Sequence, residues 1–149
     1  VSPDVGSVAR ARAFAQKLDM PMAIVDKRRQ KANSSEVMNI IGEVKDKHVI
    51  LLDDMVDTGG SLCHAAQALV DIGGAKSVTA AASHGVLSGP AIERINASVL
   101  DEVLFLDTIQ PREDIAEVCP KIKYLSVAHM FAEAIARIYE ERSVSKLFQ

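Results

Sequence analysis

The sequence has 149 residues, of which 48% are hydrophobic and 25% charged, and its formal net charge at pH 7 is -3. This length and composition are typical of one globular domain with its own core. The net charge gives no general reason to expect a nucleic-acid partner, because binding nucleic acid needs clustered positive charge, and one local basic run is the exception. No apolar run approaches the roughly 20 residues that cross a bilayer, and no secretion signal opens the chain, so we expect a cytoplasmic protein without a membrane partner.

The first predicted elements are a helix, a strand and a second β-rich run. Apolar residues recur at helical spacing from Ser7 to Leu18 and predict an amphipathic helix. Met22 to Val25 is typical of a short buried strand. We expect a loop from Asp26 to Ser35, followed by the β-rich run Val37 to Ile41.

The rest of the chain alternates strands with helices. Val49 to Leu52 is continuously apolar, as in a strand covered on both faces, so we expect it in the centre of a parallel sheet. The later predicted elements are a helix at 62–70, a strand at 78–82, a helix at 90–96, a strand at 103–106, a helix at 113–118, a strand at 124–127 and a helix at 131–141. Met130, Phe131 and Ile135 are expected to be core residues. The alternation predicts an α/β domain with a doubly wound, mainly parallel sheet.

The segment from Val49 to Ser61 combines two acidic residues with a glycine-bearing turn. Asp53 and Asp54 follow the apolar run, and Asp57-Thr58-Gly59-Gly60-Ser61 opens the next helix. Backbone N–H groups at such a turn, aided by the helix dipole, form an anion site suited to phosphate. The carboxylates would repel phosphate, so they need vicinal hydroxyls or a divalent cation as partners. The spacing therefore predicts a sugar phosphate, and ribose 5-phosphate suits it best.

This segment, Val-Ile-Leu-Leu-Asp-Asp-Met-Val-Asp-Thr-Gly-Gly-Ser, resembles the phosphoribosyl diphosphate motif of type I phosphoribosyltransferases and ribose-phosphate diphosphokinases. The resemblance implies a phosphoribosyltransferase-type fold. It also implies that Asp53 and Asp54 hold the ribose 2- and 3-hydroxyls. The residues that it assigns to the 5-phosphate are Asp57, Thr58, Gly59, Gly60 and Ser61. A plain acidic strand end before a helix cap is the alternative.

A basic run, Asp26-Lys27-Arg28-Arg29-Gln30-Lys31-Ala32-Asn33, is similar to the catalytic loop of ribose-phosphate diphosphokinases. By that resemblance Lys27 and Arg29 are catalytic residues that stabilise the transferring diphosphoryl group. Cations suit this chemistry, because in-line attack of the ribose 1-hydroxyl on the β-phosphorus of ATP builds up negative charge. A solvated charge run is the alternative.

The N-terminal segment Ser2-Pro3-Asp4-Val5-Gly6 resembles the family's Ser-Pro-Asp-x-Gly-Gly segment, whose aspartate helps to bind a magnesium ion on ATP. The resemblance therefore makes Asp4 a ligand of Mg2+, with helix capping as its alternative role. Ser7 stands where the family usually has a second glycine, which leaves the turn geometry open.

Two more segments, Ser83 to Pro90 and Ser143 to Phe148, extend the resemblance to nearly the whole chain. In class I members of the family, C-terminal serines and a phenylalanine contribute to an inter-subunit regulatory site for phosphate or ADP. By the resemblance, Ser143, Ser145 and Phe148 belong to such a site. A docked C-terminus would give the same pattern.

The resemblance implies that residues 1–149 are one C-terminal domain of a class I-like ribose-phosphate diphosphokinase. The parent enzyme would transfer diphosphate from Mg-ATP to ribose 5-phosphate for nucleotide synthesis, and it is expected to be a homo-oligomer, a hexamer. A missing N-terminal domain and a neighbouring subunit would supply the adenine contacts. Val1 to Asp4 looks like the end of a strand, so we expect a truncated chain that is inactive alone.

Two other functions stay open. A phosphoribosyltransferase that consumes phosphoribosyl diphosphate would share the Asp53-Asp54 loop, but it needs a hood over its acceptor that the sequence does not show. A non-catalytic, diphosphokinase-associated regulatory subunit would keep the fold as an interaction module. The presence of Lys27, Arg29 and Asp53 argues against that function.

Overall fold

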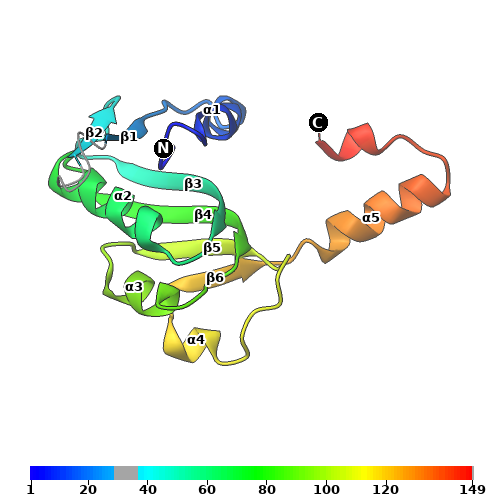
Figure 1. Ribbon diagram of the computed structural model, residues 1–149. Coiled ribbons are helices and arrows are strands. Elements are labelled where there is room, and N and C mark those ends of the chain that lie inside the picture. Colours follow the sequence, from blue (N-terminus) through cyan, green and yellow to red (C-terminus); the bar gives the residue numbers. More distant parts are fainter. Residues whose placement is uncertain (29–36, 149) are drawn as a thin grey trace.

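The computed structural model describes residues 1–28 and 37–148. Within these ranges the main body is a parallel four-stranded sheet in the order β3-β4-β5-β6 (Figure 1). The strands are β3 (His48–Val56), β4 (Ser77–Gly85), β5 (Glu102–Leu106) and β6 (Ile122–Leu125), and the connecting helices are α2 (Gly60–Asp71), α3 (Ala91–Ala97) and α4 (Ile115–Val118). The predicted α/β class and parallel sheet are confirmed.

One face of the sheet packs against α2 and carries the hydrophobic core. Alternate residues of the strands are buried there, because successive side chains of a strand point to opposite faces. The buried core residues of β3, β4 and α2 include Val49, Leu51, Val78, Ala80, Leu62, Ala65, Ala66 and Leu69. Phe105 of β5 is fully buried beside Tyr124, at 5.8 Å between ring centroids. This core fixes α2 on the face of the sheet, and with it the β3–α2 turn at the carboxyl end of β3.

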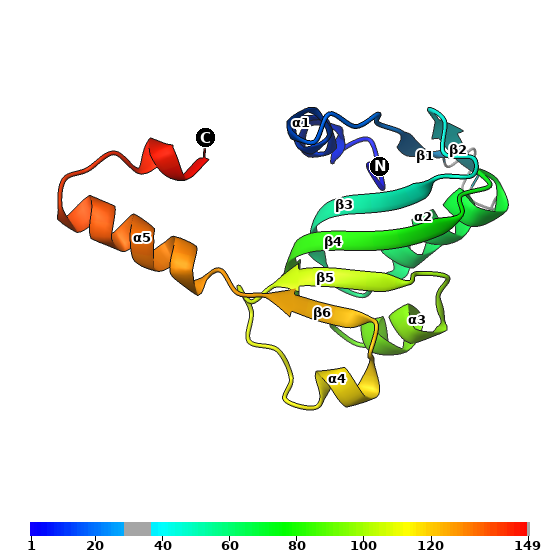
Figure 2. The same ribbon diagram turned by 180° about the vertical axis from the view of Figure 1, so that it is seen from behind.

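The other face of β3 meets α1 (Val8–Lys17). Ile50 and Leu52 of β3 line a cavity of about 390 Å³ together with Phe14 of α1. Figure 2 shows this side of the sheet, with α1 above β3 and with α2 and α3 behind the strands. Helices therefore lie on both faces of the sheet at β3, as a doubly wound arrangement requires.

The predicted central position of β3 is wrong for the sheet in residues 1–28 and 37–148, where β3 is the first strand in the order. Part of its outer edge is covered by Val1, whose ammonium group donates to the Ile50 carbonyl (2.7 Å) and whose carbonyl accepts from the Leu52 N–H (3.0 Å). The apolar run was a sign of helices on both faces, which β3 has, and not of strands on both sides.

A small antiparallel pair, β1 (Ile24–Arg28) and β2 (Val37–Ile41), forms a second sheet. Two predicted strand ends are wrong. Asp26 and Lys27 belong to β1 and not to a loop, and β3 runs on to Val56, so that Asp53 and Asp54 lie within it. Backbone pairing with β2 and β4 extends these strands through polar residues, because ladder hydrogen bonds do not depend on side-chain polarity.

The C-terminal arm, defined here as residues 128–148, contains α5 (Ala128–Tyr139) and the short 3-10 helix η1 (Val144–Phe148) and extends away from the sheet (Figures 1 and 2). None of the residues of α5 is buried, and Phe131 and Ile135 are 54% and 65% exposed. The prediction that Met130, Phe131 and Ile135 are core residues is therefore wrong for the described chain. No helix within the described ranges has the length and apolar character needed to span a membrane.

Candidate functional site

A polar cavity of about 410 Å³ lies at the carboxyl end of β3. The predicted site residues that line it are Asp4, Asp53, Asp54, Asp57, Thr58, Gly59, Gly60 and Ser61. The fold thus brings the N-terminal segment, the acidic pair and the glycine-bearing turn to one place. Ser7 and Arg10, to which the sequence analysis assigned no role in the site, line the same cavity.

The β3–α2 turn presents backbone N–H groups to this cavity. Gly59 has a φ of 72°, a left-handed conformation that glycine adopts without steric cost, and α2 begins at the next residue. The first helical hydrogen bond runs from the N–H of Cys63 to the Gly59 carbonyl (3.0 Å). The N–H groups of Gly60, Ser61 and Leu62 therefore have no acceptor within the helix, and together with the helix dipole they suit an anion.

Contacts from the other side hold the turn in place. The guanidinium of Arg94 in α3 donates to the Thr58 carbonyl (2.9 Å), and the N–H of Ser88 donates to the Asp57 carbonyl (2.9 Å). Val86 also donates its N–H to the Val56 carbonyl (3.1 Å). Because these bonds engage the outward carbonyls, the turn is preorganised before any anion arrives.

The two adjacent carboxylates are held by donors from α1, from the residue just before it and from their own strand. Oδ1 of Asp53 accepts from the Ser7 hydroxyl (3.1 Å) and from the N–H of Asp54 (2.9 Å). Oδ1 of Asp54 accepts from the N–H of Met55 (2.9 Å), and its Oδ2 accepts from the Arg10 guanidinium (3.1 Å). The same guanidinium lies 3.6 Å from Oδ1 of Asp53. Arg10 thus bridges both carboxylates.

The two carboxylates differ in how readily they ionise. Burial raises the pKa of Asp53, and the neighbouring Asp54 adds to this against the opposing hydrogen bonds from the Asp54 amide and the Ser7 hydroxyl. Burial also acts on Asp54, but the Met55 N–H, the Asp53 side chain and the Arg10 charge together leave the pKa of Asp54 below its ordinary value. The two adjacent carboxyl groups therefore have pKa values shifted in opposite directions, upward for Asp53 and downward for Asp54.

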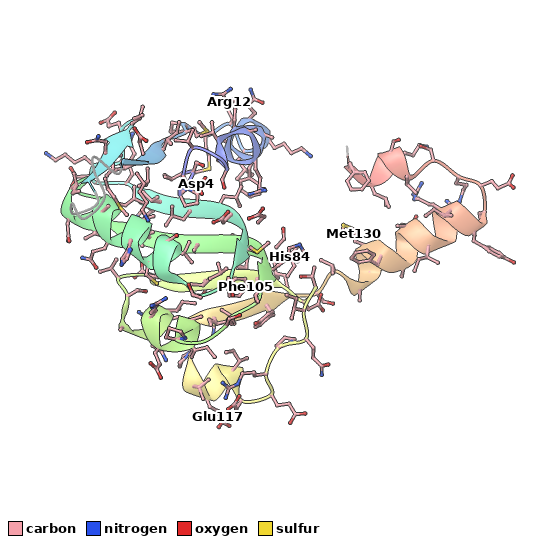
Figure 3. All side chains as sticks on the ribbon, viewed as in Figure 1. Asp4, Arg12, His84, Phe105, Glu117 and Met130 are labelled. Atoms are coloured by element: carbon pink, nitrogen blue, oxygen red, sulfur yellow. The ribbon has the colours of Figure 1, made fainter. Side chains whose placement is uncertain are left out.

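Asp4 has the capping contact that was its alternative role, because its Oδ1 accepts from the N–H of Ser7 (2.8 Å) just before α1 begins. Its side chain is exposed at the cavity, near the N-terminal end of α1 (Figure 3). Among residues 1–28 and 37–148, no group of three or more His, Cys, Asp or Glu side chains could hold a metal ion. An exposed carboxylate is a ligand type that Mg2+ accepts, and this ion commonly keeps waters and takes other ligands from substrate phosphates. The predicted role of Asp4 as a Mg2+ ligand stays a prediction.

The remaining predicted site residues that the structure describes are not among those that line this cavity. Lys27 lies on β1, paired in register with Met38, and is not among the residues that line the cavity, while Arg29 lies outside the described residues. Near the end of the C-terminal arm, the Ser143 hydroxyl accepts from the N–H of Ser145 (3.3 Å), and the Phe148 carbonyl accepts from Lys17 of α1 (3.4 Å). The predicted roles of these residues stay predictions.

Ser7 and Arg10 were missed because their contacts join segments 44 to 46 positions apart. One signal was available in the sequence. The two residues are three positions apart at the start of the predicted helix, so they share a helix face directly after the segment that contains Asp4. That signal indicates a common face, but not which strand the face meets.

Comparisons with known proteins show which proteins this chain is similar to. A family profile described as "Phosphoribosyl synthetase-associated domain" matches residues 30–149. The chain is 60% identical over 149 residues to a ribose-phosphate pyrophosphokinase of Clostridium acetobutylicum, and 59% identical over 149 residues to that of Clostridium perfringens, covering 100% of this chain and 46% of each relative. The chain therefore spans about half the length of the curated relatives it matches.

A solved structure is also similar. The crystal structure of phosphoribosylpyrophosphate synthetase from Mycobacterium smegmatis matches with a TM-score of 0.82 and 38% sequence identity. The match covers 94% of this chain and 44% of that chain. Fold and sequence therefore indicate the same group of relatives.

Proposed function

The chain belongs to the phosphoribosyl synthetase-associated domain family, and on that premise we propose that it is the ribose-5-phosphate-binding domain of a ribose-phosphate diphosphokinase. The parent enzyme transfers diphosphate from Mg-ATP to the 1-hydroxyl of ribose 5-phosphate, giving phosphoribosyl diphosphate and AMP. The observation that carries the proposal is that Asp53, Asp54 and the first residues of α2 line one and the same cavity.

The two ends of the sugar phosphate match the two halves of this cavity. Adjacent carboxylates accept hydrogen bonds from the adjacent 2- and 3-hydroxyls of ribose, and charged acceptors make such bonds stronger than neutral ones. The amides of Gly60, Ser61 and Leu62 bind the 5-phosphate. Because both ends are held, the 1-hydroxyl is oriented for reaction at little further entropic cost.

The remaining groups act on the diphosphate. Asp4 contributes a carboxylate to the Mg2+ that accompanies ATP, and the ion offsets charge on the phosphates when bound. Lys27 and Arg29 direct positive charge at the transferring group. The part of the parent protein outside this chain, with a neighbouring subunit of a homo-oligomer, completes the adenine site.

An assay of the longer parent protein tests this proposal. With ATP and ribose 5-phosphate, the wild type should release AMP, and the double variant Asp53→Asn/Asp54→Asn should lose roughly 100-fold or more in rate at low substrate, since hydrogen bonds to charged groups contribute about 1.5–3 kcal/mol each. The isolated 149-residue chain should bind ribose 5-phosphate without turning over ATP.

The rival functions give different results in the same assay. Diphosphate release from phosphoribosyl diphosphate and a nucleobase, without consumption of ATP, would identify a phosphoribosyltransferase. A folded parent protein that consumes neither substrate pair would indicate a regulatory subunit. Either result would overturn the proposal.

A further inference from the structure

The cavity at the carboxyl end of β3 has an unfavourable charge for the ligand it is proposed to bind. The acidic residues that line it are Asp4, Asp53, Asp54 and Asp57. Among the described residues that line it, Arg10 is the one cation. A phosphate ester adds up to two more negative charges, so uncompensated carboxylates would oppose its entry.

Arg10 is placed to compensate this charge. Its two terminal nitrogens lie 3.1 Å from Asp54 Oδ2 and 3.6 Å from Asp53 Oδ1, so one planar guanidinium spans both side chains. It reaches them from α1, three residues after Ser7, the residue directly before this helix, whose hydroxyl donates to the Asp53 carboxylate. The start of α1 and the residue before it therefore orient the acidic pair.

Arg10 does not need to leave when a sugar binds. A carboxylate has about four lone-pair sites, so Asp54 can accept from Arg10 and Met55 and still accept a ribose hydroxyl. The side chain of Arg10 is 41% exposed, which leaves it room to adjust. These contacts indicate that Arg10 can stay bound to the carboxylates while the ligand binds and need not be displaced by it.

We infer that Arg10 is a positioning residue of the sugar-phosphate site, which holds Asp53 and Asp54 toward the ribose hydroxyls and offsets their charge against the phosphate. The inference rests on the proposed function and adds to it a residue from outside the acidic pair and the phosphate turn. Arginine suits the role better than lysine, because its planar fork can bridge two carboxylates and a single ammonium cannot.

Titration calorimetry with ribose 5-phosphate tests this inference on four forms of the chain. These are the wild type, Arg10→Gln, Arg10→Lys and the control Arg12→Gln. Arg12 lies on the same helix, loses the same charge on substitution and does not line the cavity (Figure 3). Thermal unfolding of each variant shows whether the fold is retained.

We expect Arg10→Gln to weaken the affinity about 10- to 100-fold, the effect of losing one or two charge-assisted hydrogen bonds, and Arg12→Gln to change it less than about twofold. Arg10→Lys should fall between them. The loss in Arg10→Gln should be larger at low salt than at high salt, because salt screens the repulsion that Arg10 offsets. A purely structural role of Arg10 would give neither the partial rescue nor the salt dependence.

The outcomes separate the two levels of the proposal. A wild type without measurable affinity contradicts the proposed function itself. A wild type that binds, with Arg10→Gln equal to Arg12→Gln, overturns the role of Arg10 alone. Should Arg10→Gln fail to fold, Arg10→Lys decides: an affinity equal to that of the wild type at low salt overturns the inference, and a several-fold loss supports it.

Discussion

The carboxyl end of β3 and the C-terminal arm differ in how far the rest of the chain contacts and covers their residues. At β3, Asp53, Asp54 and the turn before α2 are held by Ser7 directly before α1, by Arg10 of α1 and by Arg94 of α3, all within this chain. On the arm, no residue of α5 is buried, and large apolar side chains such as Phe131 are exposed. Figure 3 shows Met130 on α5 away from the sheet, whereas Phe105 lies within it. The cavity should therefore keep its binding properties when the arm is changed.

The largest expected effect contrasts the stability of the two regions. Leu51 of β3 is fully buried, and Leu51→Ala should lower the free energy of unfolding by about 2–5 kcal/mol through lost burial and a residual cavity. Ile135 on α5 is 65% exposed, and Ile135→Ala should change the free energy of unfolding by less than about 0.5 kcal/mol. Urea unfolding of both variants measures these two changes. Equal losses in the free energy of unfolding would contradict the contrast, because they would mean that Ile135 is buried against another surface.

The next effect concerns the acidic pair. Asp53→Asn/Asp54→Asn should weaken ribose 5-phosphate binding by about 3 kcal/mol, or roughly 100-fold, because charged acceptors become neutral. The arm supplies a matched control in the adjacent acidic residues Glu140 and Glu141. Calorimetry on Glu140→Gln/Glu141→Gln should give the wild-type affinity, and a comparable loss there would break the contrast between the regions.

A smaller effect concerns the turn before α2. A β-carbon on Gly59 would lie 3.5 Å from the nearest atom, so Gly59→Ala fits in space, but its φ of 72° should cost about 1 kcal/mol of stability. Gly89 has a φ of 53° with open space around it and does not line the cavity. Both alanine variants should lose similar stability in urea unfolding. Only Gly59→Ala should also weaken phosphate binding, because Gly59 lines the cavity and Gly89 does not. Equally weakened phosphate binding in Gly89→Ala would contradict the assignment of the phosphate to the turn before α2.

The smallest effect is a pH dependence at Asp53. Burial raises the pKa of Asp53 in the folded protein above the ordinary aspartate value of 3.8, so the folded state binds the carboxyl proton of Asp53 more tightly than the unfolded chain does. The stability from this group is present below that value and is lost as the pH rises through the folded pKa. Asp53→Asn removes this pH-dependent loss of stability, which should amount to less than about 1 kcal/mol because the group is partly exposed. Unfolding midpoints of both proteins measured upward from about pH 4 should diverge, and parallel curves would contradict it.

Much of the fold follows from residue patterns that act locally. Apolar periodicity predicted the alternating strands and helices, and the glycine-bearing turn predicted the start of α2. Strand ends were less accurate, because Asp26 and Asp53 stay in their strands through backbone pairing with β2 and β4. Side-chain polarity carries no signal for such pairing.

Tertiary contacts account for what the sequence did not predict. The apolar stripe of α5 predicted a buried face, but a periodic stripe does not indicate what covers it. Likewise, no sequence pattern indicated that Ser7 and Arg10 contact the acidic pair. Their part in the site depends on α1 lying beside the carboxyl end of β3, a placement that the core determines and that no local pattern encodes.

The most direct measurement is a backbone amide NMR titration of the chain with inorganic phosphate, with ribose and with ribose 5-phosphate. If one cavity holds the sugar by its carboxylates and the phosphate by the first amides of α2, phosphate alone should shift the resonances of Gly60 and Ser61. Ribose 5-phosphate should shift these and also those of Asp53 and Asp54, at far lower concentration than ribose. Shifts that cluster on the C-terminal arm, or no shifts at saturating ribose 5-phosphate, would contradict this site.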